Sequence, residues 1–222
     1  MEMLFVVGLV FNGKNEAAPG LGVLVKNGRV SHVAGAEKFD GFQGPREDTT
    51  GGTLLPGLID CHVHLMLGAE PDIGEAQAKL LPGQLVIAGL RRAQQTLAGG
   101  ITAVPDCGGK DYLKFAVRDA CNGGQQLGPT ILAAGRMICM TGGHGNRSGR
   151  IADGADEVVK AVREQIHAGS DFIKIMATGS VMTPGVNPMD AHYSPTKWPP
   201  ALARPPGSIN TPPATPWAPK VS

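Results

Sequence analysis

The chain has 222 residues, and its 20 lysines and arginines nearly balance 19 aspartates and glutamates, which gives a formal net charge of +1. This balance creates no large field of one sign, so the composition gives no support to nucleic-acid or membrane-surface binding. The length allows one or two domains with a hydrophobic core, and 32 glycines favour many short elements joined by tight turns over a helical bundle.

The first segment, residues 1–52, is predicted to be β-rich. "LFVVGLVFNG" reads as an apolar strand that ends in a turn, and "LGVLVKNGRVSHVAG" places two β-rich runs around Asn27-Gly28, a strong hairpin signal. Two or three strands cannot bury both faces alone, so we expect a small sheet that packs on something else. The apolar start has no basic n-region and is too short to span a bilayer, and four cysteines without CxxC spacing suit reduced thiols. We therefore expect a cytoplasmic protein.

From Thr53 onward, predicted strands alternate with predicted helices. The strands are "LLPGLIDCHVHL", "ITAVPDCGG", "GPTILAAG" and "DFIKIMATG", and the helices span 83–98, 110–121 and 156–168. Four strands that alternate with three helices indicate βα units around a parallel sheet. Both a (β/α)8 barrel and a doubly wound sheet fit this pattern.

The pattern stops at the segment 195–222, which holds nine of the 18 prolines, both tryptophans and no acidic residue. Proline removes backbone donors and forbids a helix or a central strand, so this segment is predicted to be a disordered tail. The abrupt change near Ser194 suggests a changed reading frame or a cloning junction.

Alternation along the first strand of the barrel places Asp60, His62 and His64 on one side and Cys61 and Val63 on the other. Two imidazoles at the carboxyl end of a barrel strand lie where such barrels keep their chemistry, and imidazole binds zinc, iron or manganese. From the spacing alone, histidines that only form hydrogen bonds at a strand end remain the alternative.

The motif "PGLIDCHVH", with "GGTLLPG", "GITAVPDCGG" and "DFIKIMATG", resembles the amidohydrolase superfamily over residues 1–194, and most of all its branch of imidazolonepropionase-like enzymes and metal-dependent prolidases and carboxypeptidases. The resemblance implies an α/β fold: a small β-sandwich segment over residues 1–52, then the N-terminal half of a (β/α)8 barrel over residues 53–194. It also implies hydrolysis of an amide or peptide-like C–N bond, in a dipeptide, an N-acyl amino acid or a cyclic amide. The attacking group would be a hydroxide that one or two zinc ions generate from water, with manganese or iron as alternatives.

Lys174 is the third candidate metal ligand. It lies in a strand that is apolar on both sides, where an unpaired charge is costly, so it either extends toward the strand end or becomes neutral. A neutral amine can take up carbon dioxide, and the resemblance implies that the resulting carbamate bridges two metal ions. It also implies that His144, in "MTGGHGNRSGR", and Tyr193, in "DAHYS", lie near the substrate; an incidental histidine on a surface loop is the alternative for His144.

The resemblance implies further metal ligands on strands five, six and eight, including an aspartate, and none of these strands is expected in this chain. We therefore expect a truncated, inactive family member that takes a small amide or peptide substrate only when complete, and that can form oligomers through exposed barrel edges. The alternative is a non-catalytic fragment or interaction protein whose proline-rich segment 195–222 docks on a partner.

Overall fold

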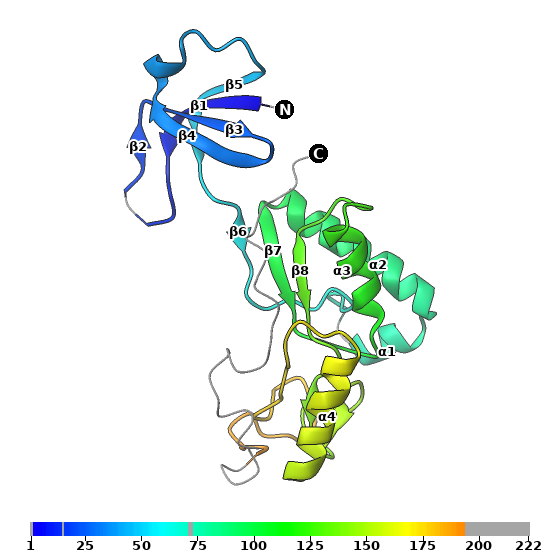
Figure 1. The fold of residues 1–222 in the computed structure, drawn as a ribbon. Helices are drawn as coiled ribbons and strands as arrows, with labels where there is room; N and C mark the ends of the chain where they lie inside the picture. The colour runs from blue at the N-terminus through cyan, green and yellow to red at the C-terminus, as the bar shows by residue number, and fades with distance from the viewer. Residues whose placement is uncertain (1, 15, 71–72, 194–222) are drawn as a thin grey trace. The chain divides into compact units, whose positions relative to one another are not determined.

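The structure is a computed structural model, and it describes residues 2–14, 16–70 and 73–193 (Figure 1). The predicted tail, residues 195–222, lies outside the described residues. The chain divides near Gly57 into two compact units, one that contains Met1–Gly57 and one that begins at Leu58. None of the described helices combines the length and apolarity that crossing a membrane requires.

The first unit is a five-stranded sheet centred on β1. Its strands are β1 (Glu2–Val10), β2 (Ala18–Pro19), β3 (Leu21–Lys26), β4 (Arg29–Gly35) and β5 (Arg46–Leu54), with a 3₁₀ helix at Ala36–Phe39. Strand β1 pairs antiparallel with β2 and β3 and parallel with β5. The predicted hairpin is confirmed, because Asn27 and Gly28 have φ angles of 51° and 73° and connect β3 to β4. Positive φ at both positions is the requirement of the tight hairpin turn that Asn-Gly favours.

The second unit is built from βα repeats. Its elements are β6 (Leu58–Ile59), α1 (Ile73–Ala78), α2 (Pro82–Ala98), β7 (Ile101–Asp106), α3 (Leu113–Asn122), β8 (Thr130–Ala133), β9 (Ile138–Cys139), β10 (Arg150–Ile151) and α4 (Ala155–His167). Strands β6, β7 and β8 form a parallel sheet in chain order. Figure 1 shows α2 and α3 together along β7 and β8. This arrangement confirms the α/β class and is that of consecutive units of a (β/α)8 barrel.

Two of the predicted strands are shorter in the structure than expected. After β6 the chain keeps only an isolated bridge between Val63 and Asp106, because the Asp60 carboxylate accepts the His62 N–H at 2.9 Å and turns the backbone. The segment predicted as the fourth strand makes two isolated parallel bridges, from Phe172 to Ala134 and from Ile175 to Ile138. One extra residue between the bridges on the 134–138 side interrupts a regular ladder.

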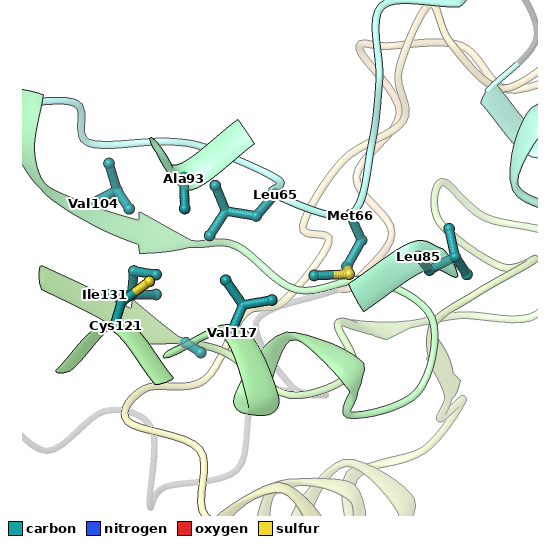
Figure 2. Close-up of a cluster of buried hydrophobic side chains, with 9 residues drawn as sticks. Leu65, Met66, Leu85, Ala93, Val104, Val117, Cys121 and Ile131 are labelled. Atoms are coloured by element: carbon teal, nitrogen blue, oxygen red, sulfur yellow. The ribbon is translucent and has the colours of Figure 1, made fainter. Parts of the chain in front are cut away.

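The core of the second unit lies between α2, α3 and the sheet (Figure 2). Its buried members are Leu65, Met66, Leu85, Ala93, Val104, Val117, Cys121, Ile131 and Ala133. Leu65 and Met66 follow the two histidines of the "HVH" motif directly. Burial of both residues therefore anchors the backbone from which His62 and His64 project.

A second cluster lies under α4. It consists of Ile138, Ala152, Val158, Ala161 and Tyr193, and Ile173 and Ile175 pack against it. These contacts fix the segment around Lys174, because its two flanking isoleucines pack against the cluster, while Lys174 and Ile175 line a hollow.

Candidate active site

A hollow of about 360 Å³ brings four of the five predicted site residues together. It is lined by His62, His64, His144, Lys174 and residues 175–180. The two "HVH" histidines come from the loop after β6, His144 from the loop between β9 and β10, and Lys174 from the segment after α4. Three segments far apart in the sequence thus converge on one place.

His62 and His64 lie side by side, as the alternation along the chain predicted. Their ring centroids are 5.3 Å apart and the ring planes are inclined by 56°. The Nδ1 of His64 forms a 2.7 Å hydrogen bond with the carbonyl oxygen of Gly108. Because a carbonyl can only accept, this contact is a hydrogen bond when Nδ1 carries the ring hydrogen. Cys61 is exposed and is not one of the described residues that line the hollow.

The environment of the hollow favours the neutral form of two of these imidazoles, those of His62 and His144. Burial lowers the pKa of His62, and the electrostatic effects of Lys174 and His64 lower it further, against an opposing effect of Asp60. Burial also lowers the pKa of His144, together with the charges of His192, Lys174 and His64. A neutral imidazole is the form that binds a metal ion or exchanges a proton with a substrate.

His144 is held within the hollow by its own partner. Its Nδ1 lies 2.8 Å from the hydroxyl oxygen of Thr183, so Nε2 is the nitrogen that remains for a ligand. A histidine that lines the hollow and has a fixed ring is placed differently from an incidental histidine on a surface loop, the alternative that the sequence left open.

Tyr193 is not among the described residues that line the hollow. It is 6% exposed, it packs in the cluster under α4, and its hydroxyl donates a 2.9 Å hydrogen bond to the carbonyl oxygen of Ala152. This environment is that of a core residue, so the position gives no support to the predicted substrate contact. The neighbouring His192 is also buried and donates its backbone N–H to Ala177.

The donor set fits a divalent metal ion in part. The imidazoles of His62 and His64 and the amine of Lys174 are present, while no described residue that lines the hollow is a carboxylate. Among the described residues there is also no group of three or more His, Cys, Asp and Glu side chains arranged to hold a metal. The described residues therefore fit an ion through His62 and His64, and the remaining coordination positions call for other donors.

Two buried charged residues near the site were not singled out from the sequence. Asp106, at the end of β7, is 0% exposed, and burial raises its pKa against the effect of its hydrogen bonds and of Lys114. Lys114, on α3, is equally buried. The signal that was available is the aspartate in "AVPDCGG", because a carboxylate at the end of an apolar strand needs specific partners.

Comparison with known proteins places the chain in a family. The Amidohydrolase family profile matches residues 53–196. Ochratoxinase of Aspergillus niger is 33% identical over 170 residues, which are 64% of this chain and 34% of that protein. Imidazolonepropionase of Ectopseudomonas mendocina (strain ymp) is 36% identical over 73 residues, 32% of this chain and 18% of that enzyme.

Solved structures give the same result over a larger part of the chain. A Xaa-Pro dipeptidase with bound methionine in its active site has a TM-score of 0.77 and 26% identity, and the match covers 87% of this chain and 51% of that one. The crystal structure of A. niger ochratoxinase has a TM-score of 0.74 and 25% identity over 88% of this chain and 51% of that one. The chain thus spans about a third of the length of ochratoxinase as a curated protein and about half of each solved structure.

Proposed function

This chain belongs to the amidohydrolase family, and we propose that its function is the metal-dependent hydrolysis of an amide or peptide-like C–N bond. The substrate class is a small molecule: a dipeptide, an N-acyl amino acid or a cyclic amide. The similarity to a Xaa-Pro dipeptidase supports the dipeptide within this class. Nucleic acid and membrane lipid are not proposed as partners, because the formal charge of +1 offers neither of them a field of one sign.

The observation that carries this proposal is the convergence of His62, His64, His144 and Lys174 on one hollow. Structural histidines at strand ends need not share a cavity with a lysine and a third histidine from distant loops. Their shared position is the arrangement that metal-assisted hydrolysis requires, with metal donors and a substrate-binding group around one space.

We assign the metal-binding role to His62 and His64, because both offer imidazole nitrogens from adjacent positions. The ion is zinc, one or two per site, with manganese or iron as alternatives. When bound, such an ion supplies Lewis acidity and activates water for attack on the substrate carbonyl.

Lys174 is proposed as a further ligand after reaction with carbon dioxide. The neutral Nζ amine forms a C–N bond with the carbon of carbon dioxide as one C=O π bond breaks, one N–H proton passes to solvent water, and the product is an anionic carbamate with two oxygen donors. This modification supplies the anionic oxygen donors that the described lining of the hollow lacks. His144 is proposed to contact the substrate through Nε2, since Thr183 occupies its Nδ1.

For this 222-residue chain by itself we propose weak zinc binding and no hydrolysis at an enzymatic rate. Two imidazoles leave an ion with too few protein donors, and the described lining offers no carboxylate to orient and deprotonate water. A cytoplasmic location is part of the same proposal. The alternative function, a non-catalytic interaction protein, depends on residues 195–222, which lie outside the described residues.

Zinc titration by calorimetry tests the metal site. The wild-type chain is compared with the double variant His62→Ala/His64→Ala and with His167→Gln, which changes an exposed histidine on α4. We expect measurable binding for the wild type and for His167→Gln, and none for the double variant. Equal zinc binding by all three proteins would show that His62 and His64 do not form the metal site. Zinc-dependent cleavage of dipeptides by the wild type that the double variant loses would overturn the expected inactivity.

A further inference from the structure

We propose that Asp106 is a positioning residue for His64. Through the backbone of Gly108, whose N–H binds Asp106 and whose carbonyl binds His64, the carboxylate holds the His64 ring in the Nδ1–H tautomer and leaves the Nε2 lone pair for a ligand in the hollow. The idea that this arrangement prepares His64 to bind metal rests on the proposed function. The tautomer can be measured in the metal-free chain and does not depend on that function.

The first step is the contact of Asp106 with two backbone segments. One carboxylate oxygen accepts the N–H of Leu65 at 3.0 Å, and the other accepts the N–H of Gly108 at 2.9 Å. Leu65 follows His64 directly, and Gly108 is the second residue after β7. A single buried carboxylate therefore joins the histidine loop to the neighbouring loop, and hydrogen bonds between a carboxylate and N–H groups are stronger than neutral ones.

The second step is the hydrogen bond that returns from Gly108 to His64. The same residue whose N–H binds Asp106 offers its carbonyl oxygen to His64 Nδ1 at 2.7 Å. Asp106 thus sets the position of the acceptor that selects the tautomer. Histidines that bind metals usually donate their second ring nitrogen to such an oxygen, and loss of this outer partner typically weakens metal binding.

The third step is the rigidity of the loop that carries the acceptor. Gly108 has φ of +93°, and a Cβ placed there would lie 2.9 Å from the carbonyl oxygen of Gly135, so the position requires glycine. The Nζ of Lys114 donates to the carbonyl oxygens of Gly109 and Gly135, at 3.3 Å and 3.1 Å. The loop at Gly108 and Gly109 is therefore held by the Asp106 carboxylate and by the Lys114 side chain.

The substitution Asp106→Asn removes a hydrogen-bond acceptor of residue 106 while it nearly keeps the shape of the side chain, so it tests the positioning role by itself. Asparagine has nearly the same volume but replaces one acceptor oxygen with an NH₂ group, so the N–H of Leu65 or of Gly108 loses its acceptor. We expect the Gly108 carbonyl to move and the His64 ring to shift toward the Nε2–H tautomer, which free imidazole side chains favour. A matched control is Asn122→Ala, because Asn122 also clamps backbone in this unit, with bonds to the N–H and the carbonyl of Ile131, but does not contact His64.

The measurement is the pair of ring ¹⁵N shifts of His64 in the metal-free, ¹⁵N-labelled chain at pH 8, assigned with His64→Gln. In the wild type and in Asn122→Ala we expect a protonated Nδ1 and an unprotonated Nε2; in Asp106→Asn we expect both shifts to move toward the opposite tautomer. Zinc affinity of Asp106→Asn should fall on the order of 10- to 100-fold. Circular dichroism establishes that each variant is folded.

Three results would overturn the proposal: a wild-type His64 protonated at Nε2, a folded Asp106→Asn chain with wild-type shifts, or the same change in Asn122→Ala. If Asp106→Asn does not fold, Gly108→Ala displaces the same carbonyl while Asp106 stays in place, and unchanged His64 shifts in that variant would equally refute the mechanism. A wild-type chain with the expected tautomer but no zinc binding would instead refute the proposed function and leave the role of Asp106 intact.

Discussion

Replacement of Lys114 by methionine should change how the stability of the chain depends on pH. Lys114 is buried, and its Nζ donates to three carbonyl oxygens, of Gly109, Asp111 and Gly135. Burial lowers the pKa of Lys114 to about 8 from 10.5, although the charges of Asp106 and Asp111 oppose this shift. The folded protein therefore binds the Lys114 proton less tightly than the unfolded chain does.

The sign and size of the change in the free energy of unfolding with pH follow from this difference in the pKa of Lys114 between the folded and unfolded states. Below pH 8 the lysine is protonated in both states, and the cost of burying the charge is constant. Between about 8 and 10.5 the unfolded chain binds more protons than the folded one, so the free energy of unfolding rises with pH. The full difference corresponds to about 3 kcal/mol. The neutral amine still has two hydrogens to donate, so the loop stays anchored.

Urea unfolding at pH 7, 8, 9 and 10.5 measures this effect as a difference between the wild type and Lys114→Met. The difference cancels other titrating groups, such as the buried Cys139 thiol, whose pKa burial raises to about 11. We expect the wild type to gain about 3 kcal/mol relative to the variant over this range. Lys110→Met, which changes an exposed lysine, controls for the loss of a lysine. A difference that stays flat or falls as pH rises would refute the reasoning.

Two further predictions concern packing and association. Ile131→Ala should lower the free energy of unfolding by about 2–5 kcal/mol, because Ile131 is 0% exposed in the core of the second unit; Leu132→Ala on the same strand, half-exposed, should cost far less, and equal losses in urea would contradict this packing. Ile59→Ser should weaken any concentration-dependent oligomer seen by light scattering, because Ile59 is 63% exposed on β6; an unchanged oligomer would exclude this strand from the interface.

The parts of the fold that depend on local sequence could be predicted. Asn27-Gly28 specified its hairpin because both residues tolerate positive φ, and the helix from Pro82 to Ala98 followed from apolar spacing and a terminal glycine. The short helix α1 was not expected, since six residues give too little periodicity to recognise. Strand lengths were overestimated because the side chain of Asp60 competes with the ladder for the backbone.

The site was predictable where neighbouring residues determine it and not where distant segments meet. The "HVH" spacing was enough to predict that His62 and His64 lie close together. The direction in which the Tyr193 side chain points depends on Ala152, 41 residues earlier, because the carbonyl oxygen of Ala152 accepts a hydrogen bond from the Tyr193 hydroxyl. The role of Asp106 likewise depends on Leu65, again 41 residues away. No local pattern contains either contact.

The two histidines of the site differ in how much order they already have. His64 is half-buried and its ring is fixed by the carbonyl of Gly108. His62 is exposed, and its hydrogen bond to Asp60 is formed by the backbone N–H and not by the ring. In the proposed metal site, binding of an ion to His64 therefore costs little side-chain entropy. Binding to the exposed His62 costs more, because it must also restrict the rotation of that side chain. The ring of His64 is attached through Gly108 and Asp106 to the neighbouring βα unit, so the metal-binding geometry proposed above depends on the pairing of β6 with β7 as well as on the "HVH" motif.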